Sequence, residues 1–152
     1  MSIAIVCLSL TLCADPETYP RPELIIDATG LNDRLNRVII LDARSEKAYD
    51  AGHIPGAVRV DVSALSKAFN SEVDAEKWSK RLGDLGVDVK TPVVVYGDDW
   101  RESARMWWIL RYWGIEHTRL LNGGITAWNA ARLAISTEPT APTRLAGGDR
   151  RR

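Results

Sequence analysis

VIILDARSEKAYDAGHIPGAVRVDV, residues 38–62, holds the pattern that decides the fold. Its first part, residues 38–44, is a β-branched apolar run that ends in polar residues, which is typical of a buried parallel strand. Residues 45–53 open with a serine and a glutamate and predict a helix, because serine can cap its first turn. Pro55-Gly56 predicts a tight turn, and the alternating polarity of residues 57–62 predicts another strand.

The rest of the chain continues this alternation of strands and helices. Strands are expected at residues 91–97 and 117–124, and the first of these, TPVVVYG, is the most hydrophobic and should be central. Helices are expected at residues 74–85, 103–113 and 125–132, with a short one at residues 31–35. Such alternation is typical of α/β proteins with a mostly parallel sheet and helices on both of its faces.

Length and charge limit the remaining choices. A chain of 152 residues suits one domain, and twenty basic against twenty acidic residues give no indication of a nucleic-acid partner. Residues 136–152, STEPTAPTRLAGGDRRR, are rich in Pro, Thr, Gly and Arg, so we expect a linker-like or disordered tail. The folded domain is therefore expected at residues 20–135.

Residues 1–14 leave two interpretations open. The apolar run at residues 3–12 is too short for a membrane-spanning helix, which needs ~20 residues. It fits a secretory signal peptide, although no lysine or arginine precedes it. The alternative is a buried strand or an N-terminal extension. The first interpretation predicts export to the periplasm or medium, and the second a cytoplasmic protein. Cys7 and Cys13 both lie in this segment, so a processed chain has no cysteine.

Three short motifs carry a family resemblance. The run from Tyr49 through His53, Ile54, Pro55 and Gly56 to Ala57 resembles the signature of the rhodanese family. Asp42-Ala43-Arg44 resembles its Asp-x-Arg motif, and Asn122-Gly123-Gly124 followed by Trp128 resembles its Asp-Gly-Gly…Trp ending. The motifs occur in the family's order over residues 20–135. The resemblance implies a rhodanese-like fold, with a central, mostly parallel five-stranded sheet flanked by helices on both faces.

The charged residues of these motifs have a structural interpretation of their own. Asp42 and Arg44 stand at the carboxyl end of a strand, where they can pair and hold the neighbouring loop. His53 precedes the turn and can hydrogen-bond to either of them, so we expect a structural role for it. No second histidine or cysteine stands near it in the motif, and we assign no metal site and no cofactor there.

Rhodaneses move sulfane sulfur from donors such as thiosulfate to acceptors such as cyanide, on a cysteine that begins the loop after the central strand. The resemblance places Gly97 at that position, so no catalytic residue is assigned. Asp98 and Asp99 follow, and one of them is expected to cap the next helix and occupy the place of an anion. Trp100, Arg101 and Glu102 complete the loop equivalent.

Other side chains near this loop do not replace the cysteine. Arg101 and Arg105 are expected to compensate part of the acidic charge. Ser103 is expected too far along the helix to act as a nucleophile, and it lacks an adjacent base.

Tyr96-Gly97-Asp98-Asp99, followed by Met106-Trp107-Trp108, is similar to the non-catalytic N-terminal half of tandem thiosulfate and 3-mercaptopyruvate sulfurtransferases. This similarity implies a half that is inactive alone, truncated or dependent on a catalytic rhodanese domain, which is either a separate chain or lost from this one. One alternative is a rhodanese-fold module that binds or regulates a protein through its loop or its tryptophan-rich helix. Another is an enzyme of a different class that uses Asp42, His53, Asp98 and Asp99 on Mg²⁺.

Overall fold

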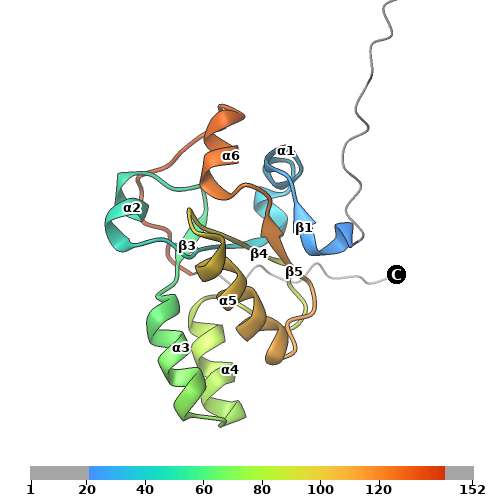
Figure 1. Ribbon diagram of the computed structural model, residues 1–152, viewed down its shortest axis with the longest axis vertical. Helices are drawn as coiled ribbons and strands as arrows, with labels where there is room; N and C mark the ends of the chain where they lie inside the picture. Colours follow the sequence, from blue (N-terminus) through green and yellow to red (C-terminus); the bar gives the residue numbers. More distant parts are fainter. Residues whose placement is uncertain (1–20, 143–152) are drawn as a thin grey trace, which may run out of the picture.

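The computed structural model describes residues 21–142. The candidate signal peptide at residues 1–14 and the end of the tail, residues 143–152, lie outside this range. Within it, five strands form one parallel sheet in the order β1-β5-β4-β2-β3 (Figure 1). The strands are β1 (Ile25–Ile26), β2 (Ile39–Asp42), β3 (Ala57–Arg59), β4 (Val93–Tyr96) and β5 (Thr118–Leu121). The predicted α/β class is therefore confirmed, with β4 in the middle.

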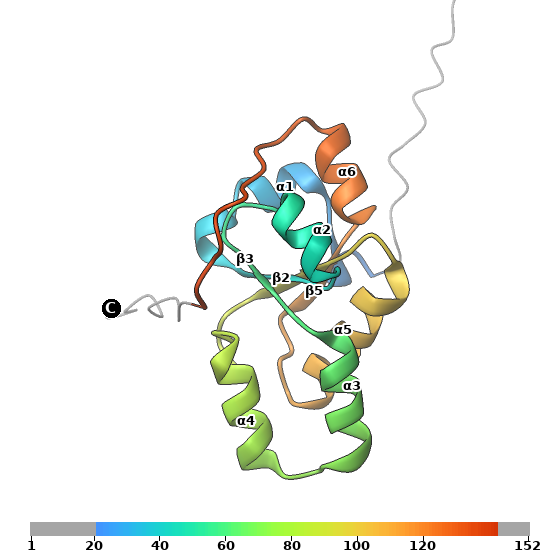
Figure 2. The ribbon, with the colours of Figure 1, turned by 90° about the vertical axis from the view of Figure 1, so that its left-hand side faces the viewer.

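Helices cover both faces of this sheet. They are α1 (Ala28–Asn32), α2 (Glu46–Ala51), α3 (Val62–Ser71), α4 (Ala75–Asp84), α5 (Trp100–Tyr112) and α6 (Gly124–Ala130), with 3₁₀ turns η1 (Pro22–Leu24) and η2 (Leu35–Arg37). Figure 2 shows α3, α4 and α5 on one side of the sheet and α1, α2 and α6 on the other. None of the helices in the described range is long and apolar enough to cross a membrane.

Two hydrophobic cores lie on the two faces, because successive side chains of a strand point in opposite directions. Val93 and Val95 join the core beneath α3, α4 and α5, together with the fully buried Trp78. Val94 and Tyr96 join the core beneath α1 and α6, together with the fully buried Trp128. This burial on both faces explains why β4 is a continuous apolar run.

Several boundaries differ from the sequence prediction. The strand expected at residues 57–62 ends at Arg59, because Asp61 accepts a hydrogen bond from the Ala64 amide at 2.9 Å and begins α3. Sequence analysis missed α3, and it did not separate the short strand β1. The first short helix begins at Ala28 because Asp27 caps it through the Gly30 amide.

Candidate functional site

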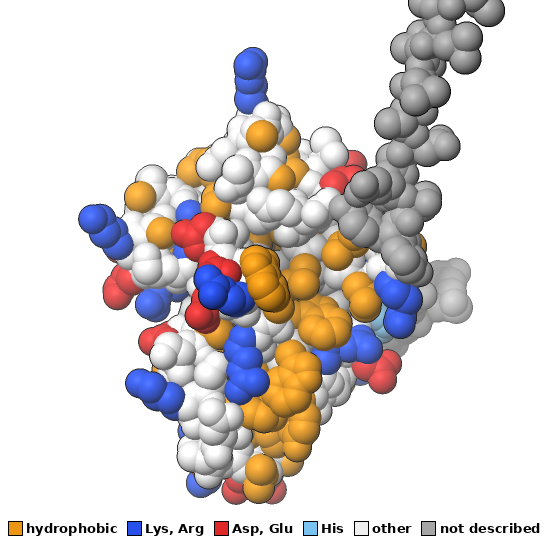
Figure 3. Space-filling view, in the orientation of Figure 1, with side chains coloured by type: hydrophobic (Ala, Val, Ile, Leu, Met, Phe, Trp, Pro, Cys, Tyr) orange, Lys and Arg blue, Asp and Glu red, His pale blue; other side chains and the backbone are white. Residues whose placement is uncertain are grey.

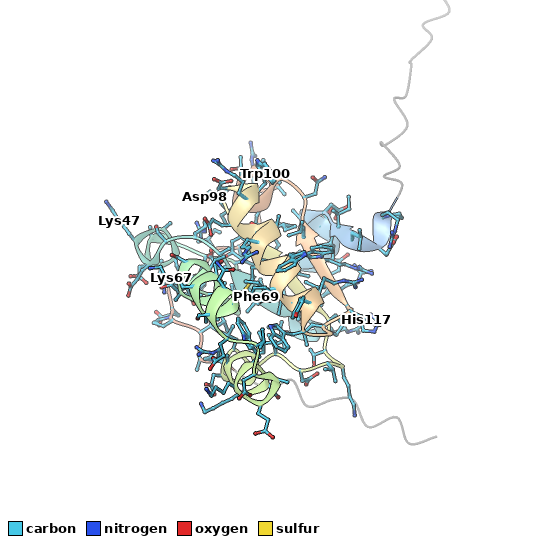
Figure 4. The ribbon with its side chains drawn as sticks, turned by 60° about the horizontal axis from the view of Figure 1, so that its bottom comes forward. Lys47, Lys67, Phe69, Asp98, Trp100 and His117 are labelled. Carbon is cyan, nitrogen blue, oxygen red and sulfur yellow. The ribbon has the colours of Figure 1, made fainter. Side chains whose placement is uncertain are left out.

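The predicted loop follows β4 at the carboxyl edge of the sheet and is shorter than expected. Asp99 is the cap of α5, since its side chain accepts a hydrogen bond from the Arg101 amide at 2.9 Å. The helix therefore begins at Trp100, and Trp100, Arg101 and Glu102 form its first turn instead of a loop. Asp98 is exposed (Figure 4 shows Asp98 beside Trp100 at this end of α5).

The charge of Asp99 is already balanced by its neighbour. The Arg101 side chain lies 2.9 Å from the Asp99 carboxylate in an exposed ion pair. Hydrogen bonds from the Arg101 side chain, and then from its amide, hold the pKa of Asp99 below its usual range. Arg105 was expected to compensate part of the acidic charge as well, but it forms no ion pair with Asp98 or Asp99 within residues 21–142. Its guanidinium turns toward α3, 3.2 Å from the Ser66 hydroxyl.

Gly97 is held against the turn that begins α6. Its carbonyl oxygen accepts a hydrogen bond from the Ile125 amide at 3.1 Å. A Cβ atom on Gly124 would lie 2.1 Å from that carbonyl oxygen, and Gly124 has a φ of +55°, so only glycine fits there. The predicted loop and the Gly-Gly motif thus form one packed unit.

Ser103 lies closer to Gly97 than the sequence suggested. A Cβ atom on Gly97 would stand 2.7 Å from the Ser103 Oγ atom. The Ser103 hydroxyl donates to the Asp99 carbonyl oxygen at 3.2 Å. The sequence held a signal for this position. Ser103 follows Asp99, the cap of α5, by four residues, and residues i and i+4 lie on one face of a helix. Within residues 21–142 this hydroxyl has no hydrogen bond to a base. That Ser103 is not a nucleophile stays a prediction.

A cavity of about 220 Å³ opens beside this unit. Its lining comprises Gly97, Asp98, Trp100, Ser103, Leu120, Leu121, Gly123 and Gly124. Asp98 is the charged side chain in that lining, and Trp100 has 78% of its surface exposed. The cavity is therefore small, partly apolar and acidic, which disfavours an anion.

Asp42 and Arg44 form the predicted pair at the end of β2. The Arg44 Nε atom lies 3.0 Å from Asp42 Oδ1, and its Nη2 atom lies 2.7 Å from Oδ2. The same Nη2 atom donates to the Gly52 carbonyl oxygen at 2.8 Å, so the pair holds the end of α2 as expected. The Tyr96 hydroxyl donates to Asp42 Oδ2 at 2.5 Å, which the sequence did not indicate.

The pKa values of Arg44 and Tyr96 are both shifted, and each shift favours the protonated form. Burial lowers the pKa of Arg44, but the hydrogen bond and charge of Asp42 outweigh it and leave the pKa raised. Burial, followed by the charge of Asp42, raises the pKa of Tyr96 well above its usual value. A neutral phenol and a charged guanidinium thus both donate to one buried carboxylate. All three side chains therefore have a partner within the network.

His53 has different partners from those expected. It is fully buried, and its ring stacks on that of Tyr49 with centroids 3.8 Å apart. Its Nδ1 atom lies 2.9 Å from the Tyr49 carbonyl oxygen, and its Nε2 atom lies 3.0 Å from the Glu138 carbonyl oxygen. Neither nitrogen bonds to Asp42 or Arg44. These contacts are those of a buried hydrogen-bonding side chain, and the structural role of His53 stays a prediction.

The remaining motif residues shape turns and the core. Pro55-Gly56 makes the predicted turn, with a φ of +79° at Gly56. Gly123 has a φ of +70° and begins α6, and the Trp128 indole donates to the Ala134 carbonyl oxygen at 2.9 Å. Within residues 21–142, no group of three or more histidine, cysteine, aspartate or glutamate side chains could hold a metal ion. Asp42 and His53 each bond within their own network, and Asp98 and Asp99 lie in the loop before α5.

The chain matches a known protein family over the part that holds these motifs. The family model for the rhodanese-like domain matches residues 27–131, which include every motif described above. The chain belongs to the rhodanese-like domain family.

Curated relatives of this rhodanese-like chain include sulfurtransferases. It is 34% identical to the thiosulfate sulfurtransferase of Corynebacterium glutamicum, over 75% of this chain and 40% of that protein. It is 34% identical to human 3-mercaptopyruvate sulfurtransferase, over 80% of this chain and 41% of that protein. It is 30% identical to the sulfur carrier protein TtuD of Thermus thermophilus, over 82% of this chain and 46% of that protein. The chain thus spans less than half the length of these relatives.

A solved structure agrees with the family assignment. The 3-mercaptopyruvate sulfotransferase SseA of Escherichia coli superposes with a TM-score of 0.68 at 26% identity. The match covers 78% of this chain and 52% of that one. The rhodanese-like fold predicted from the sequence is therefore confirmed.

Proposed function

We propose that this rhodanese-like domain is the non-catalytic half of a thiosulfate or 3-mercaptopyruvate sulfurtransferase and is inactive alone. Its partner is a catalytic rhodanese domain, either elsewhere in the same protein or on a separate chain. The observation that carries the proposal is Gly97 at the start of the β4–α5 loop. Space for a side chain there is restricted, because a Cβ atom on Gly97 would lie 2.7 Å from the Ser103 Oγ atom.

The chemistry of the loop supports this proposal. Sulfane sulfur transfer needs a thiolate, and residues 14–152 contain no cysteine. The positive end of α5 attracts anions in principle, but the Asp99 side chain already accepts from the Arg101 amide in the first turn of that helix. An incoming thiosulfate dianion would also meet the exposed carboxylate of Asp98 in the cavity lining. A donor anion is therefore repelled where the family would bind it.

A thiosulfate:cyanide assay on the purified chain tests the proposal. We expect no thiocyanate above the uncatalysed rate, both in the native chain and in a Cys7→Ser, Cys13→Ser double variant. The double variant is the matched control, because it removes both thiols of the sequence and leaves the loop intact. Catalysed thiocyanate formation by the native chain would overturn the proposal, and its survival in the double variant would show that neither cysteine is the nucleophile.

The relatives' greater length suggests where the partner is encoded. Sequencing the DNA after the codon for Arg152 identifies it. A second rhodanese-like domain with a cysteine after its central strand, in any reading frame, supports a catalytic partner from the same gene. An unrelated gene there removes that version of the proposal and leaves only a separate chain.

A second candidate function is a protein-binding module. The observation that favours it is exposed aromatic surface on α5, where Trp100, Trp108 and Tyr112 have 78%, 43% and 55% of their surfaces exposed. Figure 3 shows hydrophobic side chains running along this helix. Exposed apolar patches of this kind are typical of interfaces. An inactive chain with no second rhodanese-like domain in the neighbouring DNA would favour this function over the first.

A further inference from the structure

A second and larger cavity lies at the opposite edge of the sheet from the β4–α5 loop. Its volume is about 320 Å³, and its lining includes Val38, Val93 and His117, which stand at the amino ends of β2, β4 and β5. Figure 4 shows His117 at the far end of α5 from Asp98 and Trp100. This cavity is therefore separate from the site described above.

Arginine dominates the charged lining of this cavity. Arg21, Arg34, Arg37, Arg111 and Arg119 line it, against two carboxylates, Glu23 and Glu116. These arginines come from η1, the α1–η2 region, α5 and β5, so they approach the cavity from separate elements. Figure 3 shows blue side chains beside a pale-blue histidine at the right-hand edge of the molecule. The chain as a whole carries no net charge, so this concentration is local.

Among the residues that the structure describes, four of these five guanidinium groups have no carboxylate within 4.0 Å. Arg21 pairs with Glu23. Arg34 donates one bond to the Gly30 carbonyl oxygen at 2.6 Å, and Arg111 donates to a backbone carbonyl of Glu116. Each guanidinium has five N–H donors, so a single carbonyl bond leaves several of them available.

Arg37 and Arg119 are the most available. Among residues 21–142, no carboxylate lies within 4.0 Å of either side chain. Arg119 is half-buried in β5, where its charge lies near enough to Glu23 to lower the pKa of that carboxyl, after the larger effect of Arg21. A half-buried cation without a close carboxylate is the arrangement that an external anion stabilises.

The dimensions of the cavity make these charges act together. A compact space of about 320 Å³ is roughly 8 Å across, no more than one Debye length at physiological ionic strength. The arginines therefore repel one another across it, and a bound anion replaces that repulsion with attraction. The lining also includes four buried apolar residues, Ile26, Val38, Val93 and Val94.

We propose that this arginine-lined cavity binds a small phosphate-containing anion that carries two or more negative charges. Phosphate oxygens are arranged tetrahedrally and can accept from guanidinium groups on several sides, whereas a carboxylate has two oxygens in one plane and a single negative charge. Five arginines against two glutamates leave an excess of three positive charges, which suits a multiply charged ligand. The proposal does not depend on the sulfurtransferase assignment.

Isothermal titration calorimetry of the full 152-residue chain with sodium pyrophosphate at low ionic strength tests this site. We expect saturable binding at one site per chain that weakens as sodium chloride is added. Arg37→Gln and Arg119→Gln should each weaken binding roughly tenfold or more, because each removes a charge-assisted hydrogen-bonding group. Lys47→Gln is the control, since it removes the same charge from an exposed position on α2 (Figure 4).

Unfolding curves of the three variants in the absence of pyrophosphate show that each is folded before titration. Absence of saturable binding to the native chain overturns the proposal. Equal weakening by Lys47→Gln and the two arginine variants overturns it as well, because the attraction would then be a property of the total charge. These outcomes are independent of the thiocyanate assay, which reports on the opposite edge of the sheet.

Discussion

Replacing Tyr96 with phenylalanine removes one hydroxyl that serves two buried partners. The hydroxyl donates to Asp42 Oδ2 at 2.5 Å and accepts from the Ile54 amide at 3.2 Å, and the side chain is 1% exposed. The variant therefore leaves a buried amide without its acceptor, which costs about 1–3 kcal/mol, and removes a hydrogen bond to a charged group, which contributes about 1.5–3 kcal/mol. Arg44 still pairs with the carboxylate, so we take the lower part of both ranges and expect a loss of about 3 kcal/mol.

Urea and thermal unfolding followed by circular dichroism measure this loss. For a chain of this size, about 3 kcal/mol corresponds to a fall in Tm of roughly 9–12 °C. Tyr112→Phe is the matched control, because it deletes the same hydroxyl from a side chain that is 55% exposed on α5. A double-mutant cycle with Asp42→Asn should show a coupling of at least about 1 kcal/mol. A loss below about 1 kcal/mol, or one equal to that of Tyr112→Phe, would refute the reasoning.

Three further predictions concern the loop and the pH dependence of stability. Gly97→Cys should lower stability by about 1–2 kcal/mol in urea unfolding, because its Cβ atom meets the Ser103 hydroxyl, and Ser103→Ala in the same chain should recover most of that loss; equal losses in both backgrounds would show that the space is free. Gly124→Ala should lower the free energy of unfolding by at least about 3 kcal/mol, since its Cβ atom would overlap the Gly97 backbone. Gly56→Ala, with a positive φ and open space, should lower it by about 1 kcal/mol. Similar losses for the two variants would contradict the packing described. The raised pKa of Tyr96 predicts that stability is full below about pH 10, where the unfolded tyrosine begins to ionise, and falls as the pH rises further; a series of Tm values above that pH should fall less steeply for Tyr96→Phe than for the native chain, and identical slopes would exclude the effect.

The parallel core of the fold could be predicted from the sequence because its strands are buried on both faces. Residues 93–96 are all apolar or aromatic, and all are buried, so neither face offers a misleading alternating pattern. The helix α3 was missed for a related reason. Alternation in AVRVDV continues through Asp61, which caps the helix, so the strand pattern extends into residues that already begin the next element.

Contacts between distant segments could not be predicted from local patterns. The position of Ser103 against Gly97 depends on where α5 starts, and the fit of Gly124 against the Gly97 carbonyl depends on β4 and β5 being neighbours. His53 was expected to bond to Asp42 or Arg44, which are close to it in sequence. The Nε2 atom of His53 instead bonds to the backbone carbonyl oxygen of Glu138, which lies in a segment whose composition indicated only a linker.

That segment has a consequence for anything joined to the domain beyond it. Ser136 exchanges two backbone hydrogen bonds of 2.8 Å with His53, and the Thr140 amide donates to the Tyr49 hydroxyl at 3.2 Å. Although rich in proline and threonine, residues 136–140 are thus fastened at several points to the motif that begins with Tyr49. A domain attached after them would start from a fixed position. The flexible part of its linker would therefore begin at about residue 140 and not at the end of α6. Shortening the free tether in this way raises the effective concentration of the attached domain at nearby surfaces.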